Sequence, residues 1–412
     1  MRRFLTLLIL FLAVVSMLAG CWTPPPRLQE SGLNSRFSFC NDVPFDEYIR
    51  KTEKMIEMVR VDINETNRDV VLDANRPFEM KPDKKKYPLD KSGRHARGIL
   101  LIHGLSDSPY FMRAVSRHFQ ARGFLVRSIL LPGHGTVPGD LLHVTYKEWI
   151  KATDYGVHQM ASCVEHLYMG GFSTGGALCV REALKNPKIR GLVLFSPAFG
   201  IKSPWAFMGA YIKVFTHWLG GERDDRDYAK YESFAVNGAA QLYQLIREND
   251  AAFASGKRLR LPVFSVMSSD DISVDTEKGL KLLSAHVLSD SSRFLVYCKS
   301  EKKKQAGGDI RVVYKNSFFP EEHIAGFSHI ALLIPPEDPH YGRQGGYKSC
   351  LHYQTDRTRR MACEHDSNVW MGEITGDNLK KYTLRRLTYN PRYHDMLYAL
   401  DHFLEGVRKQ GK

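Results

Sequence analysis

One short segment has the spacing of a catalytic nucleophile: residues 171–175 read Gly-Phe-Ser-Thr-Gly, the pattern G-x-S-x-G. The apolar stretch before it, 164–169, predicts a buried strand, and the stretch after it, 177–184, predicts a helix. A serine on a sharp strand-to-helix turn needs small neighbours, because larger side chains would collide with the strained backbone. Such a turn exposes the hydroxyl above the sheet edge, so we predict that Ser173 is a nucleophile. The alternative is a glycine-rich turn of structural use only.

A serine hydroxyl is a weak nucleophile near neutral pH. It needs a base, and the base needs an orienting carboxylate. In a parallel sheet of this kind the three residues follow the chain order Ser, Asp or Glu, His. The apolar stretch 261–267 predicts a strand after the nucleophile, and a pair of aspartates follows it. The spacing D-x-x-V favours Asp271 as the carboxylate, with Asp270 and Asp275 as alternatives.

The base should lie on a loop after the last strand of the sheet. His329 occupies this place, in the run Phe-Ser-His-Ile at 327–330. A lone histidine is more often a surface residue or a satisfied core residue, but its position in the order favours His329 as the base. His323, six residues earlier, is the alternative.

The transition state of acyl transfer develops a negatively charged oxygen, which needs N–H donors already in place. One donor is expected to be the amide of Thr174, directly after the serine. The other is expected to be the amide of Leu105, in the loop 103–109 after an early strand. His103 and Gly104 are expected to shape this loop. The alternative is a plain strand-to-helix turn.

A sheet must position these residues, and from residue 97 the chain alternates apolar strands with helical segments. This alternation predicts βαβ units and a mostly parallel, doubly wound sheet of the α/β class. Continuous apolar runs such as 98–102 are expected inside a parallel sheet that is covered on both faces. The other predicted strands are 124–130, 164–169, 189–195, 261–267, 293–297 and 310–314, and the predicted helices are 48–61, 111–123, 146–165, 177–184 and 390–407.

The alternation breaks between residues 197 and 261, where the first part of the insertion is apolar almost all round. Burial in a helical cap over 201–258 is expected, with an ordinary core helix as the alternative. A lid that lines an acyl-binding cleft would use the same side chains. We therefore expect Trp205, Tyr211 and Trp218 to contact substrate.

Five motifs can be considered together: His-Gly-Leu-Ser-Asp-Ser-Pro at 103–109, Leu-Pro-Gly-His-Gly-Thr at 131–136, Gly-Phe-Ser-Thr-Gly-Gly at 171–176, Asp-Ile-Ser-Val at 271–274 and Ser-His at 328–329. They resemble the α/β-hydrolase superfamily, and within it the branch of monoacylglycerol lipases and bacterial carboxylesterases. The resemblance spans about residues 95–332 and the final helix. It implies an α/β-hydrolase fold with a cap over an acyl pocket, and it places the loop of His134 beside the active site. His103, Gly104 and His134 are accordingly expected to line the substrate site.

The chain departs from the family pattern in the long stretch between Asp271 and His329 and again after residue 335. Residues 335–371 are rich in Pro, Gly, Tyr and His and predict a long ordered loop, which we expect to remodel the pocket mouth. Cys350 and Cys363 are expected to form a disulfide. A zinc site that includes the nearby histidines is the alternative, although the spacing matches no established zinc pattern. No metal and no organic cofactor are expected.

The first twenty residues are expected to be a signal peptide rather than part of the fold. They have a basic start, a short apolar run and Leu-Ala-Gly-Cys at 18–21. That ending resembles the bacterial lipobox, which implies that Cys21 carries a lipid and anchors the chain to a membrane. The expected location is the bacterial cell envelope, facing the periplasm, and Trp22 favours the outer membrane. An ordinary cleaved signal and an uncleaved anchor are the alternatives.

The formal net charge is +13, and basic runs could lie against anionic lipid headgroups or form solvated loops. No nucleic-acid motif is present, so no such partner is expected. The sequence predicts a serine hydrolase of carboxylic esters, acting on acyl esters or lipids. An acyltransferase with the same triad, a peptide-cleaving enzyme and a non-catalytic surface lipoprotein are the alternatives. The expected organisation is a signal peptide at 1–20, a tether and N-terminal segment at 21–94, the core at 95–200 and 259–334, the cap at 201–258, and a C-terminal loop region with a closing helix at 335–412.

Overall fold

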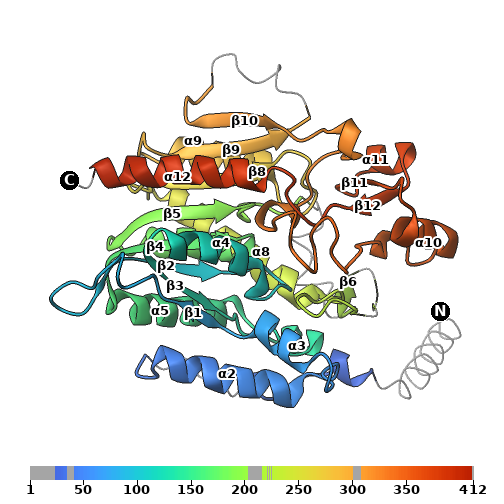
Figure 1. The fold of residues 1–412 in the computed structure, drawn as a ribbon, viewed down its shortest axis with the longest axis horizontal. Helices are drawn as coiled ribbons and strands as arrows, with labels where there is room; N and C mark the ends of the chain where they lie inside the picture. Colours follow the sequence, from blue (N-terminus) through green and yellow to red (C-terminus); the bar gives the residue numbers. More distant parts are fainter. Residues whose placement is uncertain are drawn as a thin grey trace, which may run out of the picture.

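An eight-stranded sheet in the order β1-β3-β2-β4-β5-β8-β9-β10 forms the centre of the protein (Figure 1). The computed structural model describes residues 24–34, 41–202, 216–219, 221, 223, 225–299 and 308–410. β1 is antiparallel to β3, and the remaining neighbours in this sheet are parallel, so the predicted mostly parallel α/β sheet is confirmed. The strands are β1 (Phe78–Met80), β2 (His95–Ile102), β3 (Phe124–Ile129), β4 (Val164–Phe172), β5 (Ile189–Phe195), β8 (Val263–Ser268), β9 (Arg293–Cys298) and β10 (Val312–Asn316).

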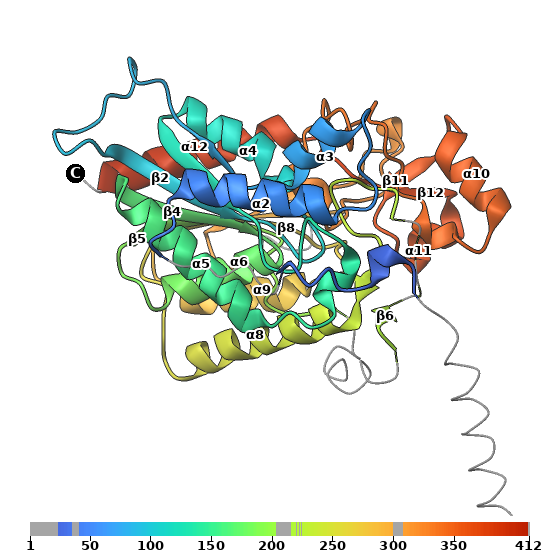
Figure 2. The same cartoon turned by 90° about the horizontal axis from the view of Figure 1, so that it is seen from below.

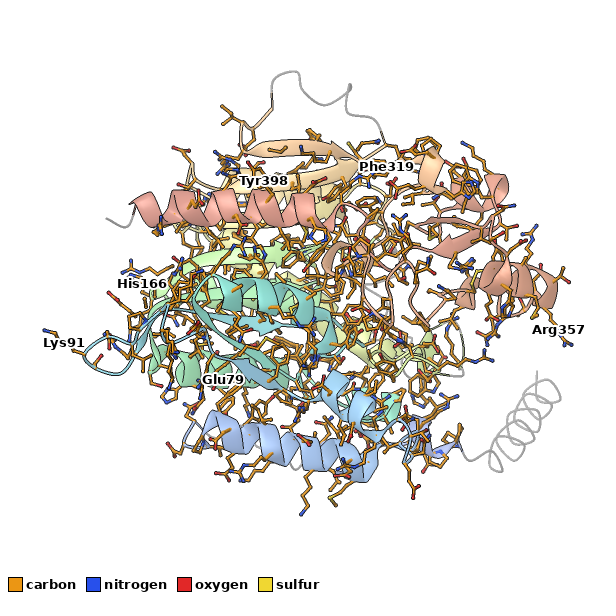
Figure 3. The ribbon with its side chains drawn as sticks, viewed as in Figure 1. Glu79, Lys91, His166, Phe319, Arg357 and Tyr398 are labelled. Carbon is orange, nitrogen blue, oxygen red and sulfur yellow. A yellow bond between two sulfur atoms is a disulfide. The ribbon has the colours of Figure 1, made fainter. Side chains whose placement is uncertain are left out.

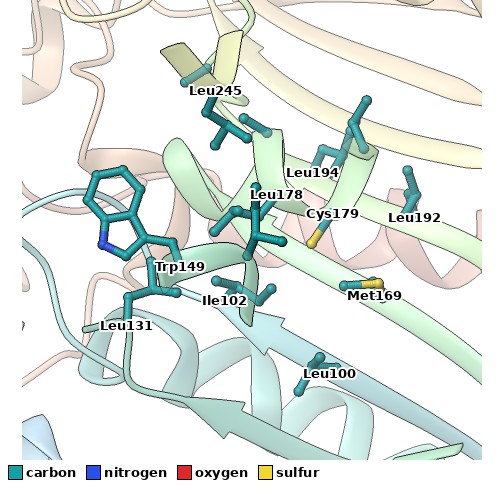
Figure 4. Packing of buried hydrophobic residues seen from close by; sticks show 14 of the residues in the cluster. Leu100, Ile102, Leu131, Trp149, Met169, Leu178, Cys179, Leu192, Leu194 and Leu245 are labelled. Carbon is teal, nitrogen blue, oxygen red and sulfur yellow. The ribbon is translucent and has the colours of Figure 1, made fainter. Parts of the chain in front are cut away.

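Helices cover both faces of this sheet, which explains the continuous apolar runs of its strands. In β2, Leu100 and Ile102 belong to one buried cluster, while Ile99 and Leu101 belong to another. Successive strand residues point to opposite faces, so a strand covered on both sides needs apolar residues at every position. The helices that supply the first cluster are α2 (Phe45–Val59), α5 (Tyr146–Ala161), α6 (Thr174–Ala183), α8 (Val236–Ala254) and α9 (Thr276–His286), and those of the second include α4 (Tyr110–Ala121) and α12 (Tyr393–Gln410). Figure 4 shows part of the first cluster. Figure 2 shows the sheet from its edge, with α4 and α12 on one side and α5, α8 and α9 on the other.

The structure describes only part of the predicted insertion, so the helical cap stays a prediction. The described part contains a short antiparallel ribbon of β6 (Trp218–Leu219) and β7 (Phe234–Ala235), followed by α8. Leu242 and Leu245 of α8 join the first core cluster. α8 therefore packs into the core of the protein. The apolar stretch at 203–215, with Trp205 and Tyr211, lies outside the described residues.

The segment 335–389, here called the C-terminal excursion, lies beyond the carboxyl ends of the parallel strands (Figure 1). The expectation of a loop over 335–371 was wrong in its second half, where α10 (Arg357–His365) forms. The Asp356 side chain caps that helix by accepting from the Arg359 N–H, but its polar sequence has no apolar period that would predict it. Figure 3 shows Arg357, the first residue of α10, far from the sheet. The excursion also contains α11 (Gly376–Lys381) and the parallel pair β11 (Trp370–Gly372) and β12 (Leu384–Arg386). The helix α3 (Arg68–Asn75) belongs to the N-terminal segment.

Candidate active site

Ser173 lies on a tight turn between β4 and α6, as the sequence predicts. Its φ of 51° and ψ of −113° place it in a region that L-residues rarely adopt. The turn fits only because its neighbours are small: a Cβ on Gly175 would lie 2.0 Å from the carbonyl oxygen of Ile102, and one on Gly171 would lie 2.3 Å from the main chain of Gly175. The residue is 6% exposed. Glycine at these two positions thus lets the start of α6 pack directly against the end of β2. Ser173 lies in the turn between the two glycines.

The structure brings Asp271 and His329 together across 58 residues of chain. Nδ1 of His329 lies 2.6 Å from Oδ2 of Asp271, and both side chains are buried. The other carboxylate oxygen accepts the main-chain N–H groups of Ser273 and Val274 at 2.7 and 3.0 Å. Burial alone would raise the pKa of Asp271, but the His329 ring and these two N–H donors outweigh it and hold the pKa below its usual range. An ionised Asp271 accepts a hydrogen bond from the Nδ1–H group of His329, which leaves Nε2 of the ring unprotonated and able to act as a base.

The alternatives for these two roles lie elsewhere. Asp270 accepts from Ser317 at 2.8 Å and lies 3.7 Å from the Lys299 ammonium. Asp275 caps the start of α9 through its side chain. The ring of His323 stacks on Trp370, with 5.4 Å between the centroids. In the described part of the chain, none of these three side chains forms a hydrogen bond or ion pair with the side chain of Asp271 or His329.

The ring of His329 lies beside the serine turn. Its centroid is 4.9 Å from that of Phe172, the residue that directly precedes Ser173. The loop 103–109 approaches the same turn from the other side, because a Cβ on Gly104 would lie 3.2 Å from Cβ of Ser173. The predicted nucleophile, base and oxyanion loop therefore converge at the carboxyl ends of β2 and β4.

The two predicted oxyanion donors are placed at this junction. Within the residues that the structure describes, the amides of Leu105 and Thr174 donate no hydrogen bond to another group. Residues 230–231 of the insertion hold the loop 103–109 in place. The Tyr231 N–H donates to the carbonyl oxygen of Ser106 at 2.8 Å, and the Lys230 ammonium pairs with Asp107 at 2.9 Å. The Ser106 carbonyl oxygen and the Asp107 side chain of this loop are thus engaged, while the Leu105 N–H has no acceptor among the described residues.

Two of the predicted substrate-contacting residues, His103 and His134, are fully buried and bond to main chain. His103 is fully buried: its Nδ1 lies 2.8 Å from the Gly104 carbonyl oxygen, and its Nε2 accepts from the Leu131 N–H at 3.0 Å. With both nitrogens bonded to main chain, His103 holds the shape of the loop, and its place in the substrate site stays a prediction. Burial lowers the pKa of the equally buried His134 to about 4, and its Nδ1 faces the Pro132 carbonyl oxygen.

Trp218 is half-buried in β6 and packs against the first core cluster. Cys350 and Cys363 form the predicted disulfide, so neither sulfur is free for zinc. Across the described ranges, no group of three or more His, Cys, Asp or Glu side chains could hold a metal ion. No helix in those ranges is both long and apolar enough to span a bilayer. Cys21 lies outside them.

Sequence reasoning missed one part of the site. The His329 main-chain N–H donates to the buried carboxylate of Glu373 at 3.0 Å, and Arg386 pairs with that carboxylate. Both residues come from the C-terminal excursion. No motif marks either of them, because the contact depends on how two distant loops pack.

Comparison with known proteins points to a hydrolase of carboxylic esters. Residues 93–228 match the family described as serine aminopeptidase, S33. A thermostable monoacylglycerol lipase of Bacillus sp. (strain H-257) is 27% identical over 176 residues, which cover 42% of this chain and 70% of that protein. A carboxylesterase of Bacillus subtilis (strain 168) is 25% identical over 192 residues, which cover 44% of this chain and 75% of that protein.

Solved structures are similar over about half of the chain. One comes from work on LipS and LipT, two metagenome-derived lipolytic enzymes, with 22% identity, a TM-score of 0.46, and coverage of 54% of this chain and 86% of that one. The monoacylglycerol lipase of Paleococcus ferrophilus has 20% identity, a TM-score of 0.42, and coverage of 53% and 87%. The sheet order, the matched family segment and the sequence relatives together identify this chain as a hydrolase with the α/β-hydrolase fold.

Proposed function

We propose that the protein hydrolyses carboxylic esters of acyl or lipid type through Ser173, His329 and Asp271. The observation that carries the proposal is the 2.6 Å contact between Asp271 and the His329 ring, which lies beside the strained turn of Ser173. The relatives named as a monoacylglycerol lipase, a carboxylesterase and a phospholipase support an ester substrate. The proposed reaction needs no metal or organic cofactor.

The chemistry follows from the roles of these groups. Oγ of Ser173 attacks the ester carbonyl carbon while Nε2 of His329 takes the hydroxyl proton. The amides of Leu105 and Thr174 stabilise the resulting oxyanion. The bond to the leaving alcohol then breaks, and His329 returns the proton to that alcohol. Water attacks the acyl-enzyme with His329 again as base, which releases the carboxylic acid and restores Ser173.

The test is a comparison of Ser173→Ala with the wild-type protein on p-nitrophenyl esters of increasing chain length. We expect Ser173→Ala to lose esterase activity and labelling by a fluorophosphonate probe, since both require the hydroxyl. Ser162→Ala, at the exposed C-terminal end of α5, is the matched control and should keep both. A Ser173→Ala protein that hydrolyses esters at the wild-type rate would refute the proposal. Product analysis with glycerol as acceptor separates hydrolysis from acyl transfer by the same residues.

We also propose that Cys21 is lipidated and anchors the enzyme in a bacterial cell envelope, facing the periplasm. The support is the run Leu-Ala-Gly-Cys at 18–21, which closes an apolar segment with a basic start. Metabolic labelling with a palmitate analogue should mark the wild-type protein and not Cys21→Ser. Fractionation of inner and outer membranes then tests the proposed outer-membrane location. A Cys21→Ser protein that is labelled and sediments with membranes as before would contradict the anchor.

A further inference from the structure

The loop that carries His329 leads directly into the C-terminal excursion. Strand β11 of the excursion pairs with the segment before that loop: the Met371 N–H donates to the His323 carbonyl oxygen at 2.7 Å, and the Ala325 N–H donates to the Met371 carbonyl oxygen at 2.7 Å. On the other side of β11, the Leu387 N–H donates to the Gly372 carbonyl oxygen at 2.9 Å. The segment that leads into the histidine loop is thus paired with β11.

Glu373 follows β11 at once and reaches the histidine itself. Its side chain has no exposed surface, and Oε2 accepts the His329 main-chain N–H at 3.0 Å. Two nitrogens of the Arg386 guanidinium donate to the carboxylate, Nε to Oε1 at 3.0 Å and Nη2 to Oε2 at 3.2 Å. A buried carboxylate is stable only when it is paired and hydrogen-bonded, and a forked guanidinium fixes its direction.

The same guanidinium also reaches the loop of Asp271. Its Nη2 lies 3.4 Å from Oγ of Ser273, whose main-chain N–H donates to Asp271. One ion pair therefore joins the loops that carry the proposed base and the proposed carboxylate. These loops come from different parts of the chain, and the ion pair fixes them relative to each other.

The disulfide of the excursion holds β12, which carries Arg386. Arg385 donates through Nε to the Cys363 carbonyl oxygen at 2.8 Å, and Sγ of Cys363 lies 3.4 Å from the Leu384 carbonyl oxygen. The Arg386 N–H donates to the carbonyl oxygen of Ser349, next to Cys350. The two cysteines therefore brace both flanks of this strand.

We propose that Glu373 is a positioning residue for ester hydrolysis, which fixes the main chain of His329 so that its ring bridges Asp271 and Ser173. This inference rests on the proposed function above. A loop histidine that shifts by about 1 Å loses its alignment with the hydroxyl, which can cost about 100-fold in rate. Arg386 orients the carboxylate, and the excursion is thereby part of the catalytic support.

The test replaces the buried ion pair by apolar side chains of similar length in Glu373→Met/Arg386→Met. Such a replacement often leaves stability unchanged, but it removes the acceptor for the His329 N–H. We expect kcat to fall by about 10- to 100-fold with KM changed by less than about 2-fold, a slower fluorophosphonate reaction, and loss of the low-field Nδ1 proton resonance of His329. Glu373→Gln keeps one oxygen for the main-chain donors and should have an intermediate kcat, which serves as the readout if the double variant does not fold.

Asp309→Asn/Arg311→Met is the matched control, because it removes a partly buried ion pair just before β10. The Arg311 guanidinium bonds to the carbonyl oxygens of Ser284 and Val287, not to the loops of His329 and Asp271. The control should lower the melting temperature and keep kcat. A Glu373→Met/Arg386→Met protein with wild-type kcat, or a control with an equal loss of kcat, would overturn the positioning role. Ser173→Ala separates the two proposals: if it remains active, the proposed function fails, and if it is inactive while the Glu373 variants are unaffected, only the positioning role fails.

Discussion

The carboxylate of Asp271 gives the sharpest test of the proposed chemistry. One of its oxygens accepts from His329, and the other accepts two main-chain N–H groups, from Ser273 and Val274. In Asp271→Asn the shape is kept, but one oxygen becomes an NH2 group. The two main-chain donors hold the amide oxygen on their side, because a turned amide would leave two buried donors unpaired at about 1–3 kcal/mol each. The NH2 group must therefore face the imidazole.

This orientation forces the imidazole into the wrong tautomer. An NH2 group cannot accept a proton, so Nδ1 of His329 must accept and the ring proton moves to Nε2. A protonated Nε2 cannot take the proton of Ser173. The loss of kcat from the wrong tautomer in a serine triad is about 10⁴-fold, which corresponds to about 5.5 kcal/mol of transition-state stabilisation. KM should change little, since Asp271 is buried behind the histidine.

The assay is steady-state hydrolysis of a p-nitrophenyl ester, with thermal unfolding measured on the same samples. Asp270→Asn is the control, because this carboxylate is adjacent in sequence and buried but pairs with Ser317 and Lys299. We expect the kcat of Asp270→Asn to stay within about 5-fold of the wild-type kcat, which is far less than the loss of about 10⁴-fold that the wrong histidine tautomer causes. An Asp271→Asn protein within tenfold of wild type, or an equal loss in Asp270→Asn, would refute this reasoning.

Three further outcomes follow from the packing and the charges. Gly175→Ala puts a methyl group against the Ile102 carbonyl oxygen, so α6 must shift; we expect about 1–3 kcal/mol less stability in urea unfolding and a fall in kcat, and an unchanged kcat would contradict the tight turn. Cys350→Ser/Cys363→Ser removes the disulfide, which joins residues 13 apart in the sequence. The free energy of unfolding should fall by about 3 kcal/mol, measured as a lower melting temperature, and the wild-type protein should show the same melting temperature only after reduction. Asp271 has a folded pKa below its unfolded value of about 3.9, so its contribution to stability is present above that value and is lost as the pH falls through the folded pKa; Asp271→Asn should therefore show a shallower acid limb of stability, and parallel curves would contradict this.

The sequence predicts the parallel strands of the sheet, the turn at Ser173 and the pairing of Asp271 with His329, because local signals and chain order determine them. Continuous apolar runs mark strands that are buried on both faces, and β5 has the predicted bounds, Ile189–Phe195. The G-x-S-x-G spacing predicts the turn at Ser173, since only glycine fits beside it. The chain order of the triad then selects Asp271 and His329, which the structure brings into contact.

The features that were missed depend on contacts between distant segments. The strand β1 has three residues, too few for a periodic signal. α10 is polar and begins at a side-chain cap. Glu373 looks like any charged residue of a polar region, and its role depends on the packing of β11 against the histidine loop. His103 belongs to a motif, but only the folded structure shows that both of its ring nitrogens bond to main chain.

The backbone of Ser173 has a consequence for how this protein can evolve. A non-glycine residue at a φ of 51° and a ψ of −113° lowers the stability of the fold by about 1–3 kcal/mol. Ser173→Gly would relieve most of this strain and should melt at a higher temperature than the wild-type protein. Selection for thermal stability at this position therefore opposes selection for the reactive hydroxyl. A homologue with glycine here would be inactive and more heat-stable.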